Sequence, residues 1–102
     1  MYGMTGKLKA QSGKREEFLA ILLQASEKVG RLPGCRMYAV TEDMANDNTI
    51  WVMEIWDDKE AHDNALKQED VRALITQAIP LMDGQPDGAE LRIVGGHGVP
   101  LP

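Results

Sequence analysis

The 102-residue sequence contains a single cysteine, Cys35, and no apolar run longer than the six residues 18–23. A lone cysteine excludes an internal disulfide framework and a zinc site made of thiolates within one chain. The apolar run is far shorter than the ~20 residues that cross a bilayer, so we expect no membrane partner. The first residues also lack the pattern of a secretory signal, and we therefore expect a cytoplasmic protein.

Basic residues are the scarcer charged type, with 11 Lys and Arg against 16 Asp and Glu and a net charge of −5. An acidic balance argues against a surface that binds phosphates, so nucleic acid is not an expected partner. The apolar share of 43% and the charged share of 26% are those of ordinary globular proteins. We expect one domain over residues 1–94, followed by a flexible Gly- and Pro-rich tail over 95–102.

Apolar periodicity predicts four strands and three helices. The strands are expected over 2–10, 36–42, 49–56 and 89–94, and the helices over 13–30, 58–68 and from 70 to a bend at Pro80. The order β-α-β-β-α-α-β predicts an α+β, ferredoxin-like fold, in which helices cover one face of a four-stranded antiparallel sheet.

The predicted strand 49–56 is apolar on both faces. Trp51, Met53 and Ile55 share one face, and Ile50, Val52 and Trp56 share the other. A sheet with one wet face alternates apolar and polar residues, so we expect the second face to be covered. The simplest cover is the sheet of a second copy, which gives a homodimeric α+β barrel; the alternative is a set of scattered exposed apolar side chains.

Three motifs resemble those of the antibiotic biosynthesis monooxygenase (ABM) family. Residues 54–61 (EIWDDKEA) resemble its Glu-x-Trp-x-x-x-x-Ala signature, 13–18 (GKREEF) its Gly-Lys-x-x-x-Phe helix start, and 33–35 (PGC) its Pro-Gly-Cys turn. The resemblance implies a homodimer with a pocket between sheet and helices in each subunit. It also implies one of several activities: cofactor-independent oxidation of quinols or anthrone-type phenols, haem degradation, or no catalysis at all.

The sequence departs from the family pattern at several positions. Histidines that many members carry after the Trp fall on Ala65 and Asp70, and the haem-ligating histidine of the haem-degrading branch falls near Ile75. Without an axial ligand, haem is not expected. The two histidines and the cysteine lie too far apart in the sequence for a metal site, so no cofactor and no metal are expected.

Two residues are candidates for proton transfer. His62 has a side chain that titrates near neutrality and lies on the expected pocket-side helix; the alternative is a surface histidine. Glu54 lies between apolar neighbours, and it is either a proton acceptor with a raised pKa or one half of an ion pair with Arg36 or Arg92.

Aromatic side chains supply the candidate substrate contacts. Trp56 can stack on an aromatic substrate or serve as core, and Trp51, on the opposite phase of the strand, has the same two possibilities. Tyr38 offers a phenolic hydroxyl as a donor to substrate or across an interface. Val52 stands where oxygenase members of the family place a polar side chain.

Together with these candidate residues, the resemblance implies a cofactor-independent monooxygenase that oxidises an electron-rich quinol or polycyclic phenol with molecular oxygen. The alternative is a non-catalytic dimer on the same fold that binds a small aromatic ligand or another partner.

Overall fold

The computed structural model describes residues 1–99; positions 100–102, the end of the tail predicted to be flexible, lie outside the described residues. The elements follow the predicted order: β1 (Tyr2–Lys9), α1 (Arg15–Val29), β2 (Cys35–Glu42), β3 (Thr49–Trp56), α2 (Lys59–Ala65), α3 (Glu69–Ala78), a 3-10 turn (Ile79–Leu81) and β4 (Asp87–Arg92). No helix within this part of the chain is both long and apolar enough to cross a membrane.

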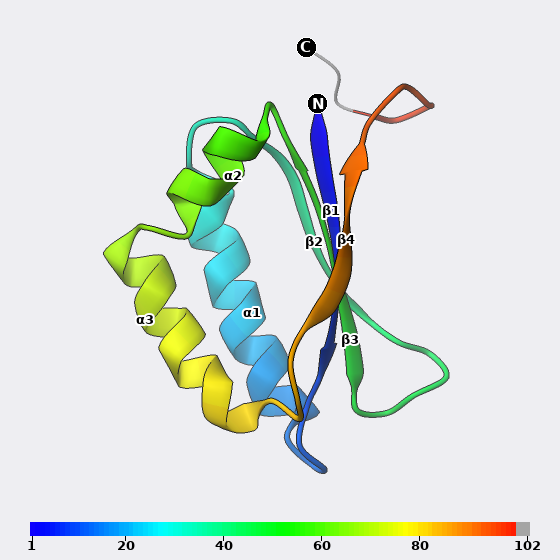
Figure 1. The fold of residues 1–102 in the computed structure, drawn as a ribbon. Helices are drawn as coiled ribbons and strands as arrows, with labels where there is room; N and C mark the ends of the chain where they lie inside the picture. Colours follow the sequence, from blue (N-terminus) through cyan, green and yellow to red (C-terminus); the bar gives the residue numbers. More distant parts are fainter. Residues whose placement is uncertain (100–102) are drawn as a thin grey trace.

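The four strands form one antiparallel sheet in the order β2-β3-β1-β4. All three helices lie on one side of this sheet (Figure 1). The predicted ferredoxin-like arrangement is confirmed, and the sheet of the single chain is open at both edges.

Helix α2 starts one residue later than a cap at Asp57 predicts. The carboxylate of Asp58 accepts a hydrogen bond from the Ala61 backbone N–H at 2.8 Å and therefore caps the helix. The Asp57 carboxylate instead accepts from Arg36 Nε at 2.6 Å, which ties the start of α2 to β2. The helix ends at Ala65, three residues before the predicted end.

The C-terminal elements are also shifted by a few residues. Helix α3 begins at Glu69, and Asp70 lies in its first turn rather than at its cap. The predicted effect of Pro80 is confirmed, because α3 stops at Ala78 and continues only as a 3-10 turn. Strand β4 begins two residues earlier than predicted and ends at Arg92.

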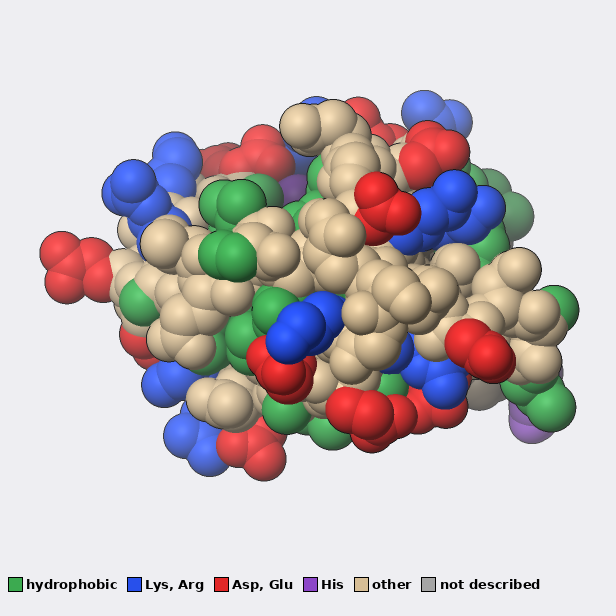
Figure 2. Space-filling view, turned by 90° about the horizontal axis from the view of Figure 1, so that it is seen from below, with side chains coloured by type: hydrophobic (Ala, Val, Ile, Leu, Met, Phe, Trp, Pro, Cys, Tyr) green, Lys and Arg blue, Asp and Glu red, His purple; other side chains and the backbone are tan. Residues whose placement is uncertain are grey.

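Two apolar clusters form the core between the sheet and the helices. One is built around Phe18 and Ile50, and the other around Trp56, which is 0% exposed and packs with Val29 and Val71. Figure 2 shows that charged side chains of both signs are interspersed on the end of the molecule seen from below, so this end has no extended basic surface.

The outer face of the sheet, opposite the helices, is largely apolar, as the sequence predicts. By register it carries Met37, Ala39, Trp51, Met53, Ile55, Ala89 and Leu91. Met53, at the centre of this face, is 41% exposed. No helix within residues 1–99 covers this face, because the helices all lie on the inner face.

Candidate functional site

A cavity of about 280 Å³ lies between the sheet and the three helices. Side chains from α1 and α3 make its apolar wall, among them Phe18, Leu22 and Leu74. Its polar groups come from the opposite side, where β2, β3 and α2 meet. A mostly apolar chamber with a few convergent polar groups is the usual form of a small-molecule site.

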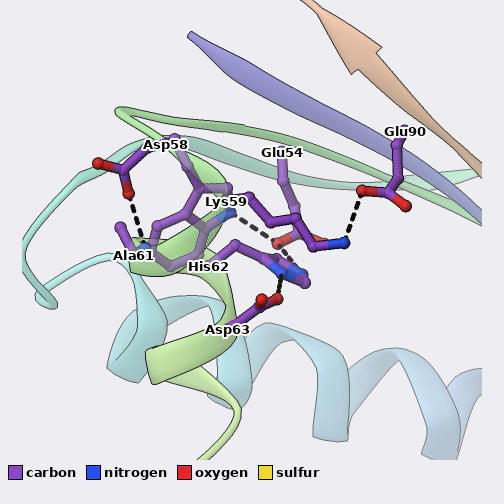
Figure 3. A network of polar contacts seen from close by, with 8 residues as sticks. Glu54, Asp58, Lys59, Ala61, His62, Asp63 and Glu90 are labelled. Atoms are coloured by element: carbon purple, nitrogen blue, oxygen red, sulfur yellow. Dashed lines mark hydrogen bonds and ion pairs between the residues drawn. The ribbon is translucent and has the colours of Figure 1, made fainter.

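Four of the five predicted site residues line this cavity: Tyr38, Glu54, Trp56 and His62. Glu54 and Trp56 face the same way because alternate residues of a strand share a face. Tyr38 joins them because it pairs with Glu54 across β2 and β3. His62 arrives from the second turn of α2, one turn beyond the Asp58 cap (Figure 3).

Glu54 has a largely buried carboxyl group at the polar end of the cavity, with a side chain 12% exposed. Its Oε1 accepts a hydrogen bond from Trp56 Nε1 at 2.9 Å and lies 4.0 Å from His62 Nε2. Burial raises the pKa of Glu54 above its ordinary value, and the indole bond and the nearby His62 limit the rise. Among the described residues Glu54 forms no ion pair with Arg92 or with Arg36, which bonds to Asp57, so that alternative is wrong.

His62 is buried rather than on the surface, with a side chain only 8% exposed. Its ring lies against the rings of Tyr2 and Trp56, with centroids 5.4 and 5.9 Å away. Nδ1 lies 3.0 Å from Asp63 Oδ1, and an ionised carboxylate only accepts, so the geometry assigns the ring hydrogen to Nδ1. Nε2 is then the acceptor that faces Glu54.

Asp63 is a site residue that sequence reasoning missed. Its side chain is 46% exposed and bonds to the imidazole from the solvent side, as Figure 3 shows for His62 between Glu54 and Asp63. The sequence offers one indication of this contact, which is that an acidic residue directly follows His62. Neighbouring residues on a helix do not normally face each other, so the spacing alone does not predict this bond.

Tyr38 carries a phenol that stays protonated at physiological pH. Burial raises the pKa of Tyr38 far above its usual range, and the charge of Glu54 acts in the same direction. A phenol in this state can donate a hydrogen bond to an oxygen that becomes negatively charged.

Trp51 does not line the cavity, because it lies on the outer face of the sheet. Its Nε1 donates to Asp43 Oδ2 at 2.8 Å, and Lys7 Nζ lies 5.6 Å from the ring centroid. This bond lowers the pKa of Asp43 and joins β3 to the β2–β3 loop.

The fold and the site define a small α+β domain with a carboxyl–imidazole pair at the end of an apolar chamber. The model of the antibiotic biosynthesis monooxygenase family matches residues 1–77. The chain belongs to this family.

Solved structures agree with this assignment. A protein of Chloroflexus aurantiacus assigned to the antibiotic biosynthesis monooxygenases is 35% identical, with 96% of this chain and 97% of that chain covered and a TM-score of 0.86. SnoaB of Streptomyces nogalater, described as a cofactor-independent oxygenase, is 16% identical over 95% of this chain and 96% of its own, with a TM-score of 0.82. At that identity the likeness concerns the fold alone.

One curated relative is an uncharacterised protein of Synechocystis. It is 33% identical over 60 residues, which are 59% of this chain and 41% of the relative. The match thus spans less than half the length of that protein.

Proposed function

We propose that this protein is a cofactor-independent monooxygenase that oxidises an electron-rich quinol or anthrone-type polycyclic phenol with molecular oxygen. The observation that carries the proposal is the largely buried pair of Glu54 and His62 at the end of an apolar chamber. Membership of the family and the fold shared with SnoaB support it.

The substrate class follows from the chemistry of oxygen. Ground-state oxygen is a triplet and reacts slowly with closed-shell molecules, so without a cofactor the substrate itself must give up an electron. Deprotonated hydroquinones and anthrones do so readily. The protein then has to take a proton, hold the resulting oxyanion and exclude water.

In this mechanism His62 Nε2 takes the proton. Asp63 holds Nδ1–H and so keeps the imidazole in the tautomer that leaves Nε2 free to accept. Glu54, 4.0 Å from Nε2, stabilises the imidazolium that forms. The Tyr38 hydroxyl donates to the oxygen of the substrate anion.

With anthrone as the example, the reaction consumes one oxygen molecule and releases anthraquinone and water. The substrate anion passes one electron to oxygen, and the radical and superoxide combine to form a carbon–oxygen bond. The peroxide takes the proton from His62. Loss of the second proton from the same carbon breaks the oxygen–oxygen bond, leaves a carbonyl group and releases hydroxide, which becomes water.

Oxygen uptake by chelator-treated, flavin-free protein tests the proposal against a panel of hydroquinones and anthrones. We expect uptake above the enzyme-free rate, with one oxygen molecule consumed for each quinone formed from an anthrone. The enzyme-free control is essential because these compounds oxidise spontaneously. Uptake no faster than this control across the panel would contradict the proposal and favour a non-catalytic ligand-binding dimer.

We also propose that the outer face of the sheet pairs with the same face of a second copy. The support is its row of apolar side chains, together with Lys7 and Asp87, which are paired in register. In a two-fold interface the same patch of each copy faces the other copy. The Lys7 of each copy can therefore contact the partner's Asp87, and the two contacts are equivalent. The helices lie on the other side of the sheet, and so does the cavity, which their side chains line.

Met53→Arg is expected to convert this dimer into a monomer, because two charges would be buried at the centre of the interface. Light scattering during gel filtration should give about twice the 11.3 kDa chain mass for the wild type and the single-chain mass for the variant. Met44→Arg is the matched control, since Met44 is fully exposed in the β2–β3 loop. A monomeric wild type at micromolar concentration would contradict the dimer.

A further inference from the structure

A second cavity, of about 520 Å³, adjoins the first on the inner face of the sheet. The two share Leu8, Tyr38, Glu54 and Pro86 as lining residues, so they meet along the inner face of the sheet, beginning at the polar end of the inner chamber. The helices make their main contacts with β2 and β3. The inner face of β1 and β4 therefore remains uncovered around Gly6 and Gly88, and we call this second cavity the β1–β4 groove.

The floor of the groove has no side chains at the cross-strand pair of Gly6 and Gly88. The structure explains why position 88 is a glycine, because a Cβ there would collide with the backbone carbonyl oxygen of Thr5. Gly6 has no such reason: its φ is not positive, and a Cβ would meet no atom within 4 Å. Glycine weakens a strand interior, and one of its recurrent uses there is the close approach of a ligand.

The groove is acidic. Its lining includes the carboxyl groups of Glu54 and Glu90, which lie on the inner face by register, and within residues 1–99 no Lys or Arg lines either cavity. Lys59 approaches from α2, but it is engaged with Glu90 at 3.0 Å (Figure 3). An anionic ligand would therefore meet acidic groups and find no Lys or Arg on the lining to bind it.

We propose that the β1–β4 groove is a specificity subsite that selects an elongated, flat, uncharged ligand and that Gly6 determines its length. One end of the ligand occupies the apolar chamber, its reactive ring lies where the cavities meet beside Tyr38 and Glu54, and the remainder lies on the bare floor at Gly6. The inner chamber alone is at the lower limit of the ~300–1,000 Å³ usual for ligand sites. The reaction of a ligand at this subsite rests on the proposed oxygenase function, whereas the binding of the ligand does not.

Three fluorescent probes test the subsite by direct titration of the intact chain. 1-Naphthylamine is short and neutral, N-phenyl-1-naphthylamine is longer and neutral, and 1-anilinonaphthalene-8-sulfonate has the longer ring system with a negative charge. The wild type is expected to bind the longer neutral probe about tenfold or more tightly than the sulfonate. Equal affinity for the two longer probes would overturn the charge selection.

Gly6→Ala and Gly6→Val test the floor in graded steps. Gly6→Val is expected to lower the affinity for the longer neutral probe by about tenfold, the usual effect of a misfit of this size in an apolar site. The affinity for 1-naphthylamine should stay within about twofold of the wild-type value. Gly6→Ala should lie between wild type and Gly6→Val. Equal losses for the short and long probes, or no loss for either, would overturn the role of Gly6.

Glu90→Gln is a second variant that does not depend on the folding of β1. It is expected to raise the affinity for the sulfonate several-fold and leave the neutral probes unchanged. Glu60→Gln is the control, because Glu60 lines neither cavity and the same charge is lost. A gain that is equal in both variants would reflect net charge only and would overturn the charge selection. These titrations need no turnover, so failure of the subsite and failure of the oxygenase activity are distinguishable.

Discussion

Glu54→Gln is expected to lower kcat for oxygen uptake by about 10²-fold or more, because proton transfer to His62 loses the charge that stabilises its product. Glutamine keeps the size of the side chain but cannot stabilise the imidazolium that forms 4.0 Å away on His62. Steady-state oxygen uptake with the best substrate of the panel measures the effect. Glu60→Gln, on the exposed side of α2, is the control and should retain the wild-type rate.

The pH profile separates this role from a structural one. Burial raises the pKa of Glu54, and the proposed mechanism needs the ionised form. The wild-type rate should therefore fall as the pH drops through this raised pKa, whereas the glutamine variant should lack that part of the profile. A variant with the same acidic limb as the wild type would contradict the assignment.

The same shift predicts the sign of the stability change with pH. A raised pKa in the folded chain favours folding below the ordinary glutamate pKa, and this contribution is lost as the pH rises through the raised value. The glutamine variant has no such loss. Its Tm should therefore decline less than that of the wild type between about pH 4 and pH 8.

His62→Ala, made in the wild type and in the Glu54→Gln variant, tests whether Glu54 and His62 act together. Groups that act as a unit show strongly non-additive losses, so the double variant should be no slower than the slower single variant. Multiplied losses would mean that Glu54 and His62 act in separate steps.

The strands were more predictable from the sequence than the helix ends. Strand β3 matches its predicted range, since eight strand-forming residues follow a polar loop. The start of α2 could not be predicted, because Asp57 and Asp58 can both cap a helix. The choice depends on Arg36, which lies on a different strand and engages Asp57.

The candidate site was predictable only in part for a similar reason. The period of two in a strand places Glu54 and Trp56 on one face, whichever strands are their neighbours. The burial of His62 depends on Tyr2, which reaches the imidazole because β1 lies beside β3. Polar neighbours of His62 in the sequence indicate an exposed helix face and give no sign of this contact.

Trp56→Ala is expected to destabilise the folded chain by about 3–5 kcal/mol, the range for removal of a fully buried large aromatic side chain. This is a large part of the ~5–15 kcal/mol that stabilises a typical domain. Thermal unfolding followed by circular dichroism should show a Tm lower by more than about 10 °C. A loss below about 1 kcal/mol would mean that the cavity around Trp56 collapses without penalty.

Trp56→Phe isolates the hydrogen bond from the packing. Phenylalanine retains most of the aromatic volume but removes the Nε1 donor that lies 2.9 Å from Glu54 Oε1, and this bond holds the pKa of Glu54 down. The acidic limb of the rate profile should therefore move to higher pH. Trp51→Phe removes an equivalent indole–carboxylate bond, to Asp43 on the outer side of the sheet, and should leave the profile unchanged. A shift of equal size in both variants would show that the indole bond at Trp56 does not tune the carboxyl group of the site.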